Sequence, residues 1–238
     1  MHDLDEFGTI RQPTATRPLL GLTVLVVEDS RFACDAMRLL CLRSGARIRR
    51  ADCLKSARRH LQVYRPTVVI IDLGLPDGSG ADLISELAAA CPRVEAILGT
   101  SGDPFCEDVS MAAGADGFLA KPIQSVPVFQ NAILQALPPG RQPPGPRLVS
   151  NDPVIPDPIA YRDDMAHAAD VLDDRSDAAT LDYVMQFLSG VARSAGDNTL
   201  EEAANALAHA KADGRPLSSD LAKVAALVQD RLSDRIAL

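Results

Sequence analysis

The sequence predicts an α/β domain built on a doubly wound parallel sheet, followed by a small all-α bundle. Short apolar runs at 24–27, 68–71, 94–98 and 117–120 are bounded by turn formers and separated by amphipathic stretches. This pattern is typical of buried parallel strands joined by crossover helices. Beyond residue 158, apolar residues recur only at helical spacing, which indicates a second, helical part.

The length of 238 residues and the 47% hydrophobic content suit two domains. We expect a polar N-terminal extension at 1–20, without the apolar stretch of a signal peptide, and an α/β domain at 21–137. The segment 138–158 contains eight prolines and is expected to be a semi-rigid, extended linker. The helical bundle is expected at 159–238.

Three or four helices are expected in the C-terminal part. One apolar face consists of Leu181, Val184, Met185, Leu188 and Val191, and another of Leu221, Val224, Leu227, Val228 and Leu232. Helix ends are indicated by Gly196 and by the Gly214-Arg-Pro sequence, and a helix start by Asn198.

Chemically reactive side chains follow each of the four apolar runs. The acid pair Glu28-Asp29 comes after the first run and Asp72 after the second. Thr100 follows the third run, and Lys121 follows the fourth. Ligands of such sheets bind beyond the carboxyl ends of the strands, so these side chains are predicted to meet at one edge.

Four segments in this order resemble the receiver domain of two-component response regulators. They are VLVVEDS at 24–30, VVIIDLGLPDGSG at 68–80, GTSG at 99–102 and GADGFLAKPI at 114–123. The resemblance covers 21–137 and implies a flavodoxin-like sheet with strand order 2-1-3-4-5. It also implies a bacterial, cytoplasmic signalling protein that catalyses its own phosphorylation and dephosphorylation, and is not otherwise an enzyme.

By this resemblance, Asp72 accepts a phosphoryl group from a phosphohistidine on a histidine kinase or a histidine phosphotransfer protein. Glu28, Asp29, Asp72 and the backbone carbonyl of Gly74 would surround one Mg²⁺ ion. Clustered carboxylates repel one another unless a cation joins them, and a hard divalent ion with oxygen ligands suits such a cluster.

The resemblance also assigns the positive charge of Lys121 and the hydroxyl of Thr100 to oxygens of the phosphoryl group. Thr100 and Phe118 would form the conformational switch, and Pro122 would shape the turn that aims Lys121, often through a cis bond. Each residue alone has an ordinary alternative, such as a helix cap, a turn residue or, for Phe118, plain core. A degenerate receiver usually lacks an acid or the lysine, and none is missing here.

Charge is distributed unevenly along the chain. Residues 31–65 contain ten basic and two acidic side chains, whereas 66–137 contain two basic and nine acidic ones. Receivers commonly dock their phosphodonor through the first helix, so the basic region favours an acidic partner, although a solvated face is the simpler explanation.

The predicted fourth helix, fifth strand and fifth helix are rich in apolar residues, namely Phe105, Val109, Ile123, Val126, Phe129, Ile133 and Leu134. This face is expected to bind a second receiver, giving a homodimer, or the rest of this chain. At rest, the C-terminal bundle is expected to cover either this face or the basic region.

The charge of the C-terminal part favours one mode of signalling output over another. It contains eight basic and fourteen acidic residues, which argues against a nucleic-acid partner and favours protein contacts within a phosphorelay. His167 and His209 could be exposed, but the sequence LAHAKADG around His209 does not match a phosphotransfer module. A transcriptional regulator and a degenerate phosphotransfer bundle remain as alternatives.

No apolar run is long enough to span a bilayer. The five cysteines show no CxxC or zinc spacing, so reduced thiols in a cytosolic protein are expected.

Overall fold

A computed structural model of the protein describes residues 12–103, 105–143, 145–148, 152–173 and 178–233. Its parallel sheet has the order β2-β1-β3-β6-β7, which confirms the predicted doubly wound topology. The strands are β1 (Thr23–Val27), β2 (Arg47–Ala51), β3 (Val68–Asp72), β6 (Ala96–Ser101) and β7 (Gly117–Ala120). A small hairpin of β4 (Gly74–Leu75) and β5 (Gly78–Ser79) follows β3.

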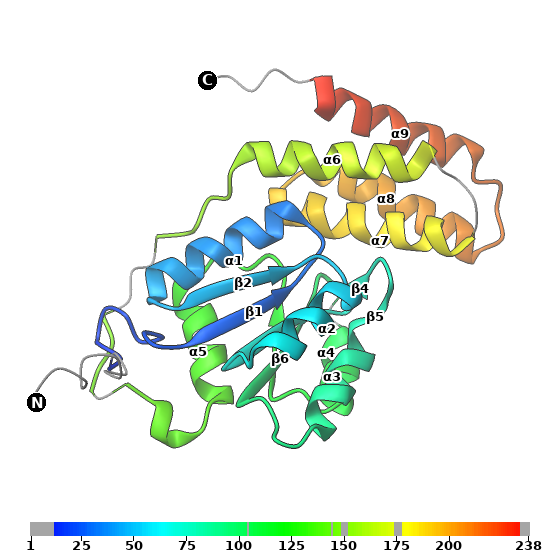
Figure 1. Ribbon diagram of the computed structural model, residues 1–238. Helices are drawn as coiled ribbons and strands as arrows, with labels where there is room; N and C mark the ends of the chain where they lie inside the picture. The colour runs from blue at the N-terminus through cyan, green and yellow to red at the C-terminus, as the bar shows by residue number, and fades with distance from the viewer. Residues whose placement is uncertain (1–11, 104, 144, 149–151, 174–177, 234–238) are drawn as a thin grey trace, which may run out of the picture.

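Helices cover both faces of the sheet (Figure 1). One face packs against α1 (Arg31–Ser44) and α5 (Val126–Ala136). The other packs against α2 (Leu54–Val63), α3 (Gly80–Ala89) and α4 (Cys106–Ala112). The sheet therefore separates two apolar cores, as a parallel sheet buried on both faces requires.

The strand ends are brought together by burial and register. All five residues of β3 are buried, and the last of them, Asp72, pairs in register with Thr100 of β6. Val27, the last residue of β1, pairs with Ile71, so the next residue, Glu28, lies at the same carboxyl edge of the sheet as Asp72. A chain that buries these apolar runs must therefore place its acids together at the carboxyl edge.

The C-terminal part forms four helices within the described residues. They are α6 (Pro158–Asp173), α7 (Ala178–Ala195), α8 (Asn198–Ala212) and α9 (Ser218–Ser233). Their shared core is apolar and includes Leu188, Leu200, Leu207 and Val228. Asp197 caps α8 and also binds Arg231 of α9. The hydrogen bonds of Arg231 are the main reason that the pKa of Asp197 falls to about 2.

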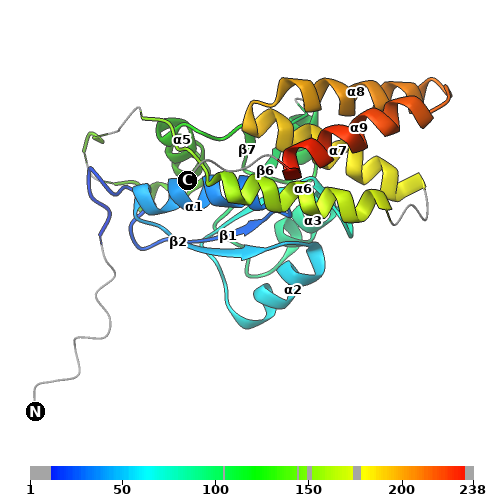
Figure 2. The ribbon, with the colours of Figure 1, turned by 90° about the horizontal axis from the view of Figure 1, so that it is seen from above.

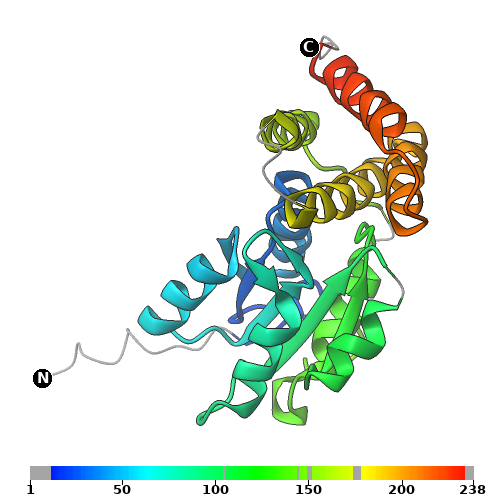
Figure 3. The same cartoon turned by 90° about the vertical axis from the view of Figure 1, so that its right-hand side faces the viewer.

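The bundle lies on the α/β domain at the carboxyl edge of the sheet. Figure 2 shows α6 running beside α1, and Figure 3 shows α7 above the strand ends. Helix α1 belongs to the basic region, so the expected docking of the bundle on the basic region is correct in part. The expected docking of the bundle on the apolar face around α4 is wrong for this structure. Phe105, just before α4, and Val109, on α4, remain 82% and 51% exposed.

The linker and the N-terminal extension both pack against the α/β domain. Val154 is 1% exposed in the α1–α5 core, and its amide donates to the carbonyl of Gln124 at 3.0 Å. Leu19 is buried in the same core, and its amide donates to the carbonyl of Ser44 at 2.9 Å. Single apolar side chains therefore anchor both segments to the α/β domain; residues 1–11 and 149–151 lie outside the described residues.

Among the described residues, no helix is both long and apolar enough to cross a membrane. All five cysteines are free thiols.

Replacing Val154 by alanine should lower the free energy of unfolding by roughly 2 kcal/mol, because it empties a filled core position. The neighbouring Ile155 is 79% exposed, so Ile155→Ala is the matched control and should change stability by less than about 0.5 kcal/mol. Urea denaturation followed by circular dichroism measures both. Equal losses in the two variants would show that the linker is not anchored at Val154.

Candidate functional site

Three carboxylates meet at the carboxyl edge of the sheet. Glu28 and Asp29 follow β1, and Asp72 ends β3, as the sequence predicted. One oxygen from each lies within 4.8 Å of the others. Glu28 and Asp72 are buried, so their charges are poorly screened by water.

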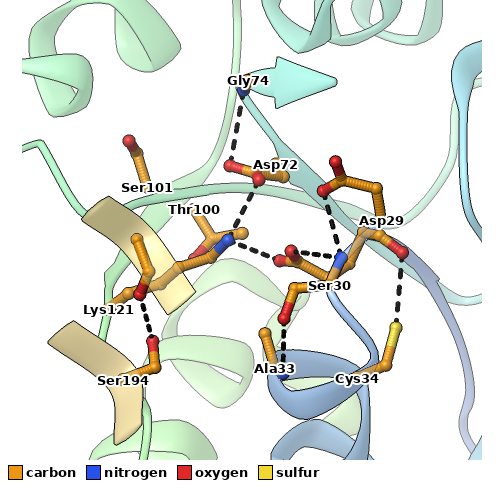
Figure 4. Close-up of polar contacts among 12 residues, drawn as sticks. Asp29, Ser30, Ala33, Cys34, Asp72, Gly74, Thr100, Ser101, Lys121 and Ser194 are labelled. Atoms are coloured by element: carbon orange, nitrogen blue, oxygen red, sulfur yellow. Dashed lines mark hydrogen bonds and ion pairs between the residues drawn. The ribbon is translucent and has the colours of Figure 1, made fainter. Parts of the chain in front are cut away.

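Lys121 supplies the positive charge of the cluster (Figure 4). Its ammonium nitrogen lies 2.6 Å from Glu28 Oε2 and 2.9 Å from Asp72 Oδ2. Burial alone would lower the pKa of Lys121, but the charges of Asp72 and Glu28 outweigh it and raise the pKa. Lys121 directly follows β7, and its bond to Pro122 is cis, in agreement with the expected turn.

Burial and the remaining negative charge raise the pKa values of Glu28 and Asp29. Burial raises the pKa of Glu28 well above its ordinary value, against the opposing attraction of Lys121. Burial and the charge of Asp72 raise the pKa of Asp29 from 3.8 to about 6. A cation that joined this cluster would relieve the repulsion and lower both pKa values.

Gly74 lies beside the acids and lines the same cavity. It opens the β4–β5 hairpin, and its amide donates to Asp72 Oδ1 at 3.4 Å. Gly80 begins α3 against the backbone of Asp72, and a Cβ there would lie 2.0 Å from the Asp72 carbonyl oxygen. The hairpin and α3 thus hold Asp72 in place by close backbone contact.

Two hydroxyl residues end β6. Thr100 is fully buried, pairs in register with Asp72 and donates to the carbonyl of Leu119 at 2.7 Å. Ser101 lines that cavity together with Asp72 and Lys121. Because side chains alternate along a strand, Ser101 shares the face of Gly99, which pairs with Phe118.

Because Thr100 pairs with Asp72, these two side chains share one face of the sheet, and Ser101 lies on the other face, where its hydroxyl accepts from the amide of Asp103 at 3.1 Å. The role of Thr100 at a phosphoryl group stays a prediction. Phe118 is half-buried against the α2–α3–α4 core, as a switch residue or a plain core residue would be.

Side chains of the bundle complete the cavity. Gln186, Gly190 and Ser194 of α7 line it opposite Asp72, and Figure 4 shows Ser194 close to Lys121. Tyr183, also on α7, donates its hydroxyl to Asp29 Oδ2 at 2.6 Å. No motif in the sequence marks these residues, because their partners on the receiver are far away in the sequence.

The two histidines singled out in the sequence are both exposed. His167 Nε2 lies 3.0 Å from the hydroxyl of Tyr183, and its ring packs edge-on against Phe187. His209 lies on α8, which makes no direct hydrogen bond to the acid cluster in the described residues. Neither geometry gives either histidine a reactive role.

The fold and the acid cluster with its lysine define a class of doubly wound α/β domain with an acidic site at the carboxyl edge of its sheet. Residues 24–132 match the model of the response regulator receiver domain, and this part of the chain is a receiver domain.

Curated relatives include the KDP operon transcriptional regulatory protein KdpE of Escherichia coli, 32% identical over 101 residues, or 42% of this chain and 44% of KdpE. The virulence transcriptional regulatory protein PhoP of Salmonella typhimurium is 29% identical over 117 residues, or 49% of this chain and 51% of PhoP. The chain therefore spans about half the length of these relatives. Their names give no support to the expectation that nucleic acid is not a partner.

Among solved structures, the chemotaxis response regulator CheY4 of Vibrio cholerae is similar, with 21% identity and a TM-score of 0.43. The match covers 49% of this chain and 98% of that one.

The residues present fit a divalent metal ion. Three carboxylates and one ammonium leave the cluster with excess negative charge, and all the ligands on offer are oxygens. Mg²⁺ prefers a few carboxylates supplemented by carbonyl oxygen and water. Glu28, Asp29 and Asp72 would hold the ion, with the carbonyl of Gly74 nearby.

Mg²⁺ affinity should fall below pH 6. The raised pKa of Asp29 means that the metal-free protein gains a proton there as the pH falls through about 6. Mg²⁺ must displace this proton, so affinity should drop by up to about tenfold per pH unit below that point and level off above it. Calorimetry at pH 5 and 7.5, in buffers of different ionisation enthalpy, measures both the affinity and the proton release. Equal affinity and no proton release would contradict this account.

Proposed function

We propose that the protein is a two-component response regulator in which Asp72 is phosphorylated, with Mg²⁺, by a phosphohistidine of a partner kinase or phosphotransfer protein. The supporting observation is the buried Lys121 ammonium, held between Glu28 and Asp72 beside Asp29. Phosphoryl transfer mainly requires positioning and charge neutralisation, which this cluster provides. The protein is then a switch that acts on itself, not an enzyme with an external substrate.

In the transfer step, a carboxylate oxygen of Asp72 attacks phosphorus and forms an O–P bond. The P–N bond to the donor imidazole breaks, and its electron pair stays on the departing nitrogen. Asp72 suits this role because its carboxylate is fixed by the Lys121 ammonium and the Gly74 amide. Hydrolysis of the acyl phosphate by water returns the protein to its starting state.

Neutralising the transferred group requires positive charge from two sources. A bound Mg²⁺ would polarise the phosphoryl oxygens and offset the charge of the acids. Lys121 can exchange its contact with Asp72 Oδ2 for one with a phosphoryl oxygen, while Glu28 keeps the ammonium in place. We assign the remaining hydrogen bond to Thr100, which shares the face of Asp72, with Phe118 as its partner in the switch.

The output is proposed to be a change in protein contacts made by the receiver and the acidic bundle. The direct contacts between α7 and the acid cluster support this, since chemistry at Asp72 must alter them. An output by nucleic-acid binding is the second candidate, favoured by the names of the curated relatives. A gel shift of the full chain with and without phosphorylation, across a salt series, separates the two.

Intact-mass measurement after incubation with acetyl phosphate and Mg²⁺ should show one added phosphoryl group on the wild-type protein. Asp72→Asn should show none, because the nucleophilic oxygen is replaced by an amide. Asp77→Asn is the control, since its carboxylate accepts from the amides of Leu54 and Lys55, outside the site. An adduct that persists in Asp72→Asn, or that needs no Mg²⁺, would refute the proposal.

Thr100→Val should slow phosphorylation by roughly tenfold, about the effect of one hydrogen bond to a charged group. It should also lower the free energy of unfolding by about 1 kcal/mol, because the buried Leu119 carbonyl loses its donor. Ser101→Ala should leave the rate near that of wild type, because its hydroxyl accepts from the amide of Asp103. Stopped-flow rates and urea denaturation measure the pair. The reverse pattern would move the phosphoryl contact to Ser101.

A further inference from the structure

Helices α6 and α7 close the face of the receiver that carries Asp72 (Figure 3). The cavity left between Asp72, Lys121 and Gln186 has a volume of about 30 Å³. That is room for roughly two water molecules. A phosphohistidine on another protein needs an open approach to Asp72, so this conformation excludes a macromolecular phosphodonor.

Asp164 of α6 holds the first turn of α1. Its carboxylate accepts from Ser30 Oγ at 2.7 Å and from the amides of Arg31 and Phe32 at 2.7 and 3.1 Å. The side chain is buried, with the residue 2% exposed, so its charge is compensated by these donors and by the dipole of α1. The first turn of α1 therefore relies on α6 for an acceptor, without which its amides would need water.

Tyr183 of α7 binds the acid cluster itself. Its hydroxyl donates to Asp29 Oδ2 at 2.6 Å and also lies 3.0 Å from His167 Nε2. One turn further along α7, the amide of Gln186 covers Gly74, where an added Cβ would lie 2.4 Å from Gln186 Nε2. Thus α7 contacts both a carboxylate ligand and the residue whose carbonyl is expected to complete the metal site.

The tyrosine hydroxyl and a metal ion make opposing demands on Asp29. The Tyr183 hydroxyl directs its partly positive hydrogen at Asp29 Oδ2. A divalent cation at the site would attract the same carboxylate. Mg²⁺ requires ligand oxygens at about 2.0–2.1 Å in octahedral geometry, so a loaded site polarises Asp29 and repels that dipole. Metal binding should therefore weaken the contact that holds α7.

Other interdomain contacts are more peripheral. Arg31 pairs with Asp163 at 2.7 Å, but both side chains are largely exposed, so this pair contributes little. Arg193 of α7 donates to the carbonyl of Gly102, at the rim of the cavity.

We propose that Asp164 and Tyr183 form a latch that holds α6 and α7 over Asp72, and that a divalent metal ion at Asp29 opens this latch. The bundle and a phosphodonor protein then compete for one face of the receiver. The inference rests on the function proposed above, because it requires Asp72 to be the phosphoacceptor. It adds a regulatory role for two residues of the helical part.

The test uses the full chain with two latch variants, Tyr183→Phe and Asp164→Ala, and two matched controls. Tyr161→Phe removes a hydroxyl on the same bundle that binds Asp197 and not the receiver. Asp163→Ala removes an acid next to Asp164 that makes only the exposed pair with Arg31. Calorimetry gives Mg²⁺ affinity, and hydrogen–deuterium exchange follows the amides of Arg31 and Phe32.

Tyr183→Phe should bind Mg²⁺ roughly fivefold to tenfold more tightly than wild type, the equivalent of one lost hydrogen bond. Exchange at Arg31 and Phe32 should rise when Mg²⁺ saturates the wild-type protein, and Asp164→Ala should show fast exchange without metal. Both controls should behave like wild type.

Wild-type Mg²⁺ affinity in Tyr183→Phe, with metal-independent exchange at Arg31 and Phe32, would overturn the latch. If the Asp72 adduct still forms in these proteins, only the latch fails. If no protein binds Mg²⁺ or gains the adduct, the proposed function fails, and the latch falls with it.

Discussion

The structure depends on one buried ammonium among three carboxylates. Lys121 contacts Glu28 and Asp72 at 2.6 and 2.9 Å, and without it the two acids would be buried with no compensating charge. Placing Lys121 there requires the carboxyl ends of β1, β3 and β7 to meet, which the strand order achieves. The ammonium neutralises only part of the charge, and the proposed metal ion would offset the remainder.

The same excess charge connects the site to the helical part. Tyr183 approaches as a hydrogen-bond donor to Asp29, while Asp164 uses the positive end of α1 directly beside the cluster. A phosphoryl group brings about −1.5 to −2 charges at neutral pH. On Asp72, it would add to the charge of the acid cluster that Tyr183 contacts. In the proposed function, phosphorylation would therefore change the electrostatic field at the surface where the receiver meets the bundle.

Sequence reasoning recovered the acid cluster and Lys121, because each follows an apolar run, and the strand order came from the resemblance to the receiver family. It could not place the side chain of Thr100 beside that of Asp72, since the face of a strand residue is known only once its register is known. Val154 was hidden by surrounding prolines. Asp164 looks like any solvated acid in the sequence YRDDM, because its partners lie more than 130 residues away.

Small-angle X-ray scattering of the full chain, without metal and with Mg²⁺ and beryllofluoride, tests the central claim most directly. Mg²⁺ should open the latch, and beryllofluoride, which stands in for the phosphoryl group on Asp72, should keep α6 and α7 released from the receiver. The account predicts a larger radius of gyration at unchanged molecular mass, and no change in Asp72→Asn. An unchanged radius in the wild-type protein, with beryllofluoride bound, would show that the helices stay in place and contradict the account.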